Sequence, residues 1–384
     1  MHCGPHFLLH HQASHCEQAV SNSMLLLWGL MTSILRVIVL LLLALLGHGE
    51  ARTEVRKAPD FGGGAVWLDK GERLPHHIPG YRGHVVLIDF WEYTCINCIR
   101  DFAVLKRWYG KYQAHGLVII GVHRGEFDIG FKEENVRAAA KRFRLPWPIV
   151  ADQTGSTWKA FHASGWPDRF LIDSHGDIVM EVLGERNNHE LESRIRELLA
   201  ASNSEVTKEN LDTDEDAFKS ECGVPTQETF VGQLYGRGAV DDLDSHKIGD
   251  VADFLPPHSP PDGAVMLTGR WRVERDSVAS AGHSSSAEIR YHARSLYAVL
   301  SLEDTKQERV DLFLDGHPLP REEAGADVQF DSRGAYVEVS DARMFYLVRS
   351  PNFSAHLLAL VVPGSGLRVH SFTYGNNCQL LDRP

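Results

Sequence analysis

The sequence is poor in cysteine, and it lacks the positive charge that nucleic-acid binding requires. Six cysteines are spread over 384 residues, and 51 acidic residues outnumber 39 basic ones, for a net charge of −12. An acidic chain is not attracted to nucleic acids or to anionic membrane surfaces. One pair, Cys95 and Cys98, has C-x-x-C spacing, but neither a second such pair nor an H-x-H pair exists to complete a zinc site. The sequence therefore implies no nucleic-acid partner, no metal and no organic cofactor.

The first 51 residues do not resemble a folded domain. Residues 1–23 are interpreted as an upstream extension of the reading frame, although their histidines could also form a metal-binding tail. Arg36 ends a short basic segment, and residues 37–46 form an unbroken apolar run followed by small residues. This order is typical of a secretory signal peptide. The alternative is a membrane anchor over residues 25–46, which the charge of Arg36 disfavours. In either case we expect export to a periplasmic or other extracytoplasmic compartment, where disulfides form.

Residues 85–90 are almost wholly apolar and rich in β-branched side chains, and they predict a buried central strand of a parallel sheet. From Cys95 onward, apolar residues recur at helical spacing, as at Ile99, Phe102 and Leu105. Cys95 therefore marks the point where a strand leads into a helix. Because the first amides of a helix lack partners and carry the positive end of its dipole, a thiolate there is stabilised.

Cys98 follows Cys95 by one helical turn and lies on the same face of the predicted helix. The two sulfurs can therefore close a disulfide with little movement of the backbone. We expect Cys95 to attack the disulfide of a partner protein and Cys98 to resolve the mixed disulfide.

The residues around these cysteines carry a resemblance to a known superfamily. Asp89-Phe90-Trp91, followed three residues later by C-x-x-C, resembles the signature of the thioredoxin superfamily. The longer string FWEYTCINCIR resembles the extracytoplasmic branch of TlpA-like proteins, and especially the soluble C-terminal part of DipZ-type proteins. The resemblance runs from about residue 58 to the C-terminus and is strongest over residues 85–199.

The resemblance implies an α/β thioredoxin fold with a TlpA-type insertion around residues 124–151, in a domain at residues 58–201. The elements expected after the first helix are a strand at 117–122, a helix at 132–144, a strand at 146–150, a hairpin at 170–183 and a helix at 191–201.

The resemblance also implies roles for four residues near the cysteines. Asp89 matches the buried acid of thioredoxin, and a carboxyl buried in a strand has a raised pKa and can exchange a proton with the resolving thiol. Asp101 falls where TlpA-like proteins carry glutamate; it either tunes the thiol or simply favours the helix dipole. Glu126 fits an acidic position near the site of relatives, and Trp91 is expected to shield the disulfide and contact the substrate.

Trp166-Pro167 occupies the place where thioredoxin-like proteins carry a cis proline before the hairpin. We expect this peptide bond to be cis. The backbone of Trp166 would then be free to pair with an extended segment of a protein substrate beside the sulfurs.

A linker and a second domain complete the predicted chain. Residues 202–225 are polar and acidic and are predicted to be a linker. Residues 226–384 predict an all-β sandwich, jelly-roll-like, with a loop at 239–261. The eight expected strands lie at 267–274, 287–292, 296–302, 310–314, 335–339, 344–349, 354–362 and 367–374.

The second domain contains no catalytic constellation, and its role stays open between scaffold, protein docking and glycan binding. Its aromatic residues are either an exposed ligand surface or part of the core; these are Trp271, Tyr291, Tyr297 and Tyr346. Cys222 and Cys378 flank this domain, and either a disulfide joins them or both are free.

Together these features predict an extracytoplasmic thiol-disulfide oxidoreductase that acts on proteins with disulfides or thiols, as a reductase supplied by a membrane or periplasmic electron donor. The alternatives are an oxidant or disulfide isomerase, and a glycan- or partner-binding protein with an accessory redox domain. A peroxidase is disfavoured because the residues before Cys95 lack the proline of the peroxidase pattern.

Overall fold

The computed structural model describes residues 56–68, 75–201, 204–212, 223–234, 240, 243–255, 261–304 and 306–375. The predicted signal peptide, Cys222 and Cys378 lie outside these residues. Within the described part of the chain, none of the helices has the length and apolar character needed to cross a membrane.

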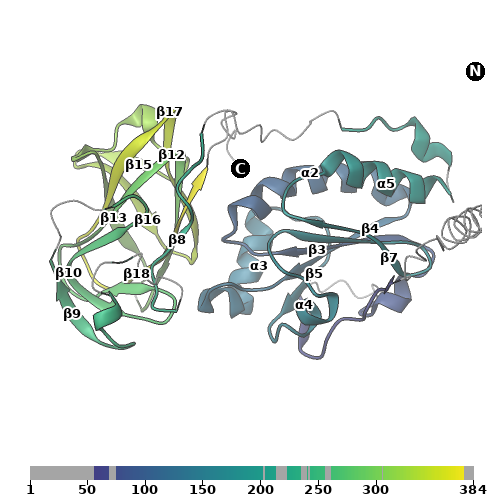
Figure 1. The fold of residues 1–384 in the computed structure, drawn as a ribbon, viewed down its shortest axis with the longest axis horizontal. Coiled ribbons are helices and arrows are strands. Elements are labelled where there is room, and N and C mark those ends of the chain that lie inside the picture. Colours follow the sequence, from purple (N-terminus) through teal and green to yellow (C-terminus); the bar gives the residue numbers. More distant parts are fainter. Residues whose placement is uncertain are drawn as a thin grey trace, which may run out of the picture. The chain divides into compact units, whose positions relative to one another are not determined.

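The N-terminal domain is built on a seven-stranded mixed sheet in the order β1-β7-β6-β3-β4-β5-β2 (Figure 1). Strand β3 is central and completely buried; it runs parallel to β4 and antiparallel to β6. The strands are β1 (Arg56–Lys57), β2 (Ala65–Trp67), β3 (Val85–Trp91), β4 (Leu117–His123), β5 (Ile149–Asp152), β6 (Asp168–Ile172) and β7 (Asp177–Leu183).

Helices cover both faces of this sheet, because alternate residues of the central strands point to opposite sides. Leu87 and Trp91 of β3 pack in one core with α2 (Ile96–Tyr112), α3 (Glu133–Arg142) and α5 (Asn188–Ala200). Ile88 and Phe90 pack on the other side with α4 (Ser156–Phe161). Figure 1 shows α2 and α5 on one side of the sheet and α4 on the other. This is the thioredoxin fold, as predicted.

Helix α4 was not predicted. It has six residues, too few for an apolar periodicity to show in the sequence. Its first turn is stabilised from outside the helix, since the carboxylate of Asp152 at the end of β5 accepts hydrogen bonds from the amides of Thr157 (3.3 Å) and Trp158 (2.8 Å). These hydrogen bonds form only when β5 places Asp152 beside the helix, so the sequence of the helix alone does not predict them.

Part of the segment predicted as a linker packs against the N-terminal domain. Ser204–Lys208 forms a short 3₁₀ helix, and Val206 is fully buried in the core that contains α2 and α5. Asp212 accepts a hydrogen bond from Arg107 of α2 at 2.8 Å and pairs with Lys111. The chain is therefore held to the N-terminal domain at least as far as residue 212.

The described residues of the C-terminal domain form a single hydrogen-bonded sheet of eleven strands. Two strands are far longer than predicted, because residues 287–302 and 344–362 each form one continuous strand where two were expected. The strands are β8 (Thr229–Phe230), β9 (Val251–Phe254), β10 (Val265–Val273), β11 (Val278–Ser280), β12 (Ser285–Leu302), β13 (Glu308–Leu314), β14 (His317–Pro318), β15 (Gln329–Asp331), β16 (Gly334–Val339), β17 (Arg343–Val362) and β18 (Leu367–Gly375).

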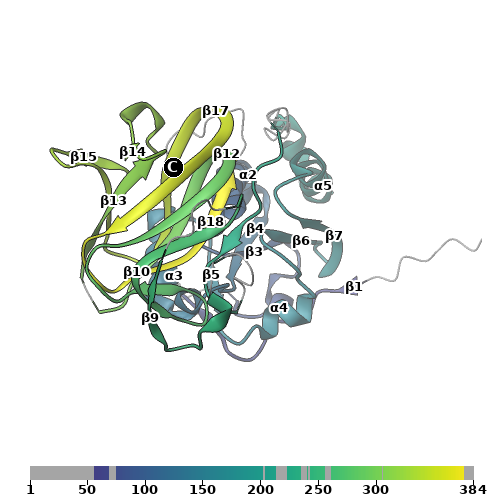
Figure 2. The same ribbon diagram turned by 60° about the vertical axis from the view of Figure 1, so that its left-hand side comes forward.

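The long strands bend at bulges, which explains why the sequence pattern breaks there. Strand β12 pairs with β17 along most of its length, with register shifts at Ala293/Ser295 and at Leu296/Tyr297. Before the bend β12 also pairs with β10, and after it with β18. Figure 2 shows β12 and β17 running alongside each other. The sheet thus folds over on itself and encloses one core.

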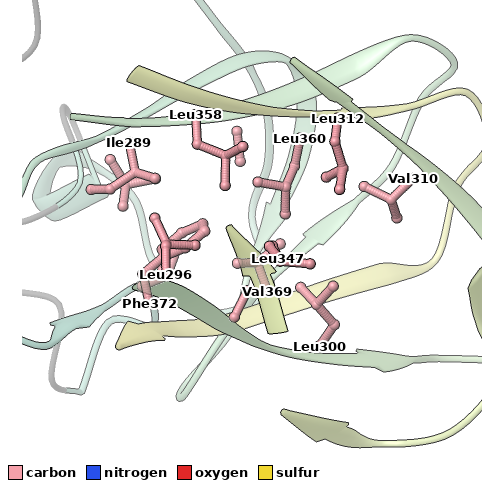
Figure 3. Packing of buried hydrophobic residues seen from close by; sticks show 14 of the residues in the cluster. Ile289, Leu296, Leu300, Val310, Leu312, Leu347, Leu358, Leu360, Val369 and Phe372 are labelled. Atoms are coloured by element: carbon pink, nitrogen blue, oxygen red, sulfur yellow. The ribbon is translucent and has the colours of Figure 1, made fainter. Parts of the chain in front are cut away.

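This core is lined by aliphatic and aromatic side chains from both halves of the sheet. In Figure 3, Leu312, Leu358 and Leu360 face Leu300 and Phe372 across the interior. Trp271 and Tyr291 are fully buried in the same core, and Tyr297 is 4% exposed. Trp271 and Tyr291 therefore belong to this core, whereas Tyr297 is buried in a separate apolar cluster. None of the three forms an exposed sugar-binding surface. The predicted loop at 239–261 contains strand β9, which pairs with β10.

Candidate active site

The two cysteines lie where the sequence predicts, at the start of α2. Cys95 is the residue before the helix, with extended backbone angles, and Cys98 lies in its first turn. Both thiols are free in this structure; Cys95 is half-buried, whereas Cys98 is 1% exposed. The Cys95 thiol faces the carbonyl oxygen of Trp166 at 3.7 Å. The pair is thus asymmetric, with one sulfur open to a partner and the other enclosed.

Burial also separates the two sulfurs chemically. The pKa of Cys98 is raised well above its usual value, first by burial and then by its hydrogen bond to Cys95 and the nearby charges of Cys95 and Asp89. A thiol that stays protonated cannot attack until a base removes its proton. For Cys98 to act as an attacking thiolate, it would therefore need a proton acceptor.

Asp89 lies on β3 beneath the cysteines and is 1% exposed. Neither of its carboxyl oxygens has a hydrogen-bond partner among the described residues. Burial raises the pKa of Asp89 well above its usual value; the charge of Asp101 raises it further, and Arg169 opposes the shift. The buried acid that the thioredoxin resemblance implies is present.

Asp101 is buried as well, and it lies beyond the first turn of α2, which contains no acidic residue. It is 2% exposed, and its Oδ1 lies 3.1 Å from Nη1 of Arg169. Burial raises the pKa of Asp101, and the guanidinium of Arg169 counteracts this shift. The two buried carboxyls near the cysteines thus differ, since one has a cationic partner and the other has none.

Arg169 was not identified from the sequence. It lies on β6, two residues after Pro167, and is fully buried. The register of β6 against β3 places it directly opposite Asp89. The two charged residues that begin the strand string DRFLI, directly before its apolar part, are the one sequence signal that could have singled it out.

The Trp166–Pro167 peptide bond is cis, as predicted. The ring of Trp166 packs against Trp158 of α4 at 4.9 Å between centroids. Trp91 has no exposed surface and lies in the same core cluster as Cys98, where it makes edge contacts with Phe102 and His123. It supports the site from below and has no surface with which to contact a substrate.

Glu126 lies in the loop after β4 and is half-buried. Its pKa is raised to about 9, first by burial and then by the charges of Glu228 and Glu92. Glu92, which was not identified from the sequence, directly follows β3 and is fully buried. Its Oε1 lies 3.6 Å from Nε2 of His123. Glu92 also accepts hydrogen bonds from the amide and hydroxyl of Thr94. It thereby shapes the turn that leads into Cys95.

Ile96, between the two cysteines, is 6% exposed. It belongs to an apolar cluster with two residues of the β4–α3 loop and three residues of the C-terminal domain. These are Phe127, Ile129, Tyr297, Val299 and Met344. The described residues contain no group of three or more histidine, cysteine or acidic side chains arranged to hold a metal.

Comparisons with known proteins agree with this geometry. One family model, the AhpC/TSA family, matches residues 56–180, and another, the thioredoxin like C-terminal domain, matches residues 226–375. The thiol-disulfide oxidoreductase ResA of Geobacillus thermodenitrificans is 31% identical over 171 residues, which are 42% of this chain and 92% of that relative. This chain belongs to the thioredoxin-like thiol-disulfide oxidoreductase family.

Protein DipZ of Mycobacterium bovis is 30% identical to this oxidoreductase-family chain over 322 residues, or 83% of the chain. The match spans 43% of the length of DipZ. A solved thiol:disulfide interchange protein of the thioredoxin family from Chlorobium tepidum aligns with 39% of this chain and 99% of its own, at 20% identity and a TM-score of 0.33.

Proposed function

We propose that this protein is an exported thiol-disulfide oxidoreductase that reduces disulfides of partner proteins through Cys95 and Cys98. The observation that carries the proposal is the asymmetry of the pair, with Cys95 half-buried beside the Trp166 carbonyl and Cys98 enclosed above a buried acid. Export is inferred from the signal-peptide pattern around residues 37–46. Domains at 58–201 and 226–384 complete the proposal; the segment 202–225 joins them, and its residues 204–212 are held against the first domain.

The first step joins the protein to its partner. The Cys95 thiolate attacks one sulfur of the partner disulfide, so that a new S–S bond forms and the partner's own S–S bond breaks. The second partner sulfur leaves as a thiolate and takes up a proton. The backbone of Trp166, next to Pro167, would hold the partner segment in an extended conformation during this step.

The second step releases the partner. Asp89 accepts the proton of Cys98, and the resulting thiolate attacks the sulfur of Cys95. The mixed disulfide breaks, and the partner leaves with two thiols after gaining two electrons and two protons. A Cys95–Cys98 disulfide remains, which a dithiol electron donor in the membrane or the periplasm must reduce again.

The C-terminal domain is proposed to dock a protein, either the partner or the electron donor. Protein docking is preferred to glycan binding because Trp271, Tyr291 and Tyr297 are buried and are not available to stack on a sugar. Tyr346 is half-buried and stacks on Tyr297 at 4.5 Å.

Equilibration of the protein with glutathione or dithiothreitol buffers, followed by alkylation and mass measurement, tests the direction of electron flow. The reduction potential is about −270 mV for thioredoxin and about −120 mV for the oxidant DsbA. If this protein is a reductase, the potential of its Cys95–Cys98 pair should lie closer to the first value. A value near the second figure would make the protein an oxidant. An insulin-reduction assay with dithiothreitol as donor tests the activity itself, and absence of turnover by the intact protein would refute the proposal.

A further inference from the structure

Two buried carboxyls and one buried cation lie together beneath the cysteines. Asp89 is on β3, Asp101 on α2 and Arg169 on β6, and none is more than 2% exposed. In an antiparallel pair, directly opposite residues have their Cβ atoms about 4.5–5.5 Å apart. Asp89 and Arg169 are directly opposite, so an ion pair between them would be the simplest expectation.

The hydrogen bonds of Arg169 go elsewhere. Its Nη1 donates to Asp101 Oδ1 at 3.1 Å and to Asn188 Oδ1 at 2.6 Å. Its Nη2 donates to the carbonyl oxygens of Gly184 at 2.8 Å and Arg186 at 2.9 Å. These partners come from α2, from the segment after β7 and from the start of α5. The guanidinium is therefore fixed from three directions, and it could not turn to Asp89 without losing some of these bonds.

We propose that Arg169 is a positioning residue that holds Asp101 as a fixed anion and so leaves Asp89 as the carboxyl that exchanges a proton with Cys98. This inference rests on the proposed function, in which Cys98 must lose a proton before it attacks. Arg169 touches neither the reacting sulfurs nor the substrate; it acts through the two acids.

The electrostatics follow from this pairing. Two neighbouring buried carboxyls do not both ionise readily, and a cation decides which one does. Burial raises the pKa of Asp101, and Arg169 counteracts that rise. The pKa of Asp89 is raised first by burial and then by the charge of Asp101, and Arg169 opposes this rise as well. A base whose pKa lies close to the working pH is the more effective proton acceptor. Pairing the cation with Asp101 leaves Asp89 without a hydrogen-bonded cation, so Asp89 keeps the raised pKa that a proton acceptor for Cys98 needs.

Several other charged or titratable groups face the two acids. Cys98 contributes from α2 and Asp168 from β6, where the charge of Asp168 adds to the rise in the pKa of Asp89. Glu185 follows β7 and is paired with Arg100 at 3.0 Å. Its pKa is raised to about 7, chiefly by burial. The variants below leave all these groups in place, so a shift in the pH profile reports on the carboxyl pair.

The test isolates the second chemical step. The reduced protein is mixed with oxidised glutathione, and the release of the second glutathione thiol from Cys95 is followed over a range of pH. Asp101→Asn removes the anion that raises the pKa of Asp89 and leaves Arg169 in place as the nearby cation that lowers it. We expect the midpoint of the pH profile to move to lower pH and the rate at neutral pH to fall about tenfold. Arg169→Lys should retain more of the wild-type profile than Arg169→Gln.

Asn188→Ala is the matched control, since it removes one anchor of Arg169 without changing any charge. It should lower the stability and leave the midpoint unchanged. If Asp101→Asn keeps the wild-type midpoint while Asp89→Asn alters the profile, Arg169 is only a structural tie and this inference fails, although the proposed function stands. If Asp89→Asn itself leaves the profile unchanged, the proton-transfer part of the proposed function fails as well. Folding of each variant is checked by circular dichroism. If Arg169→Gln does not fold, the pH profile of Asp101→Asn still tests the inference.

Discussion

The sulfur of Cys95 lies 3.7 Å from the carbonyl oxygen of Trp166, a residue 71 positions further along the chain. The strand β3 leads into the cysteine, and the cis peptide before β6 presents the carbonyl. These two strands are hydrogen-bonded neighbours. The proposed nucleophile and the backbone that would hold a substrate are therefore positioned by one pair of strands.

Removing each sulfur in turn should separate the two steps of exchange. Cys95→Ala should abolish insulin reduction, because no other described thiol is accessible to start the reaction. Cys98→Ala should also abolish turnover, but it should accumulate mixed disulfides that non-reducing gels and mass spectrometry detect. Cys222→Ala, outside the motif, serves as the control and should retain turnover. Full activity of Cys98→Ala would contradict the assignment of the resolving residue.

The two thiols should also differ in their reaction with iodoacetamide. Cys98 is 1% exposed, and burial raises its pKa, so its thiolate is scarce near neutral pH. We expect Cys95 to be alkylated first across pH 6–8, as peptide mass mapping of the reduced protein would show. Preferential labelling of Cys98 at pH 6 would reverse the roles of the two residues.

The sequence was sufficient for the parts of the site that are local. Cys95, Cys98 and Asp89 belong to one strand–helix segment, and the apolar run at residues 85–90 predicts both the strand and the burial of the acid within it. The cis bond at Trp166–Pro167 was also expected, because the resemblance to thioredoxin-like proteins implies a cis proline before the hairpin.

The parts that could not be predicted depend on register between distant segments. Arg169 meets Asp101, 68 residues away, only because β6 pairs with β3 beneath α2. Likewise, β12 looks like two strands in the sequence because its bulges interrupt the alternation of buried residues. In both cases the deciding contact is made with a strand that is distant in the sequence, and the local sequence pattern does not predict that contact.

Asp89→Asn should slow exchange and stabilise the fold at neutral pH. A carboxyl whose pKa is higher in the folded state than in the unfolded chain costs stability as the pH rises above the unfolded value, because the unfolded state releases the proton more readily. Burial raises the pKa of Asp89, and its oxygens have no described hydrogen-bond partner. Removing such a group should raise the free energy of unfolding by about 1–3 kcal/mol at pH 7. Urea unfolding of both proteins at pH 4 and pH 7 measures this difference in the free energy of unfolding. If the difference between the variant and the wild type is the same at both pH values, the prediction is wrong.

Glu126 should make the stability of the protein depend on pH between the acid and mildly alkaline ranges. Its pKa is raised from 4.5 to about 9, chiefly by burial and then by Glu228 and Glu92. Between these two pH values the unfolded chain has released a proton that the folded protein keeps, so the free energy of unfolding falls as the pH rises and levels off above about 9. Glu126→Gln removes the titrating group.

The variant should therefore be more stable than the wild type at pH 7, and its stability should fall less steeply from pH 5 to pH 9. Because Glu126 is only half-buried, solvent screening will reduce the size of the effect. Glu134→Gln, which replaces an exposed acid on α3, is the matched control and should leave the slope unchanged. Chemical unfolding at pH 5, 7 and 9 measures all three proteins. If Glu126→Gln and the wild type show parallel pH curves, Glu126 is already ionised in the folded protein at neutral pH and plays no part in this dependence.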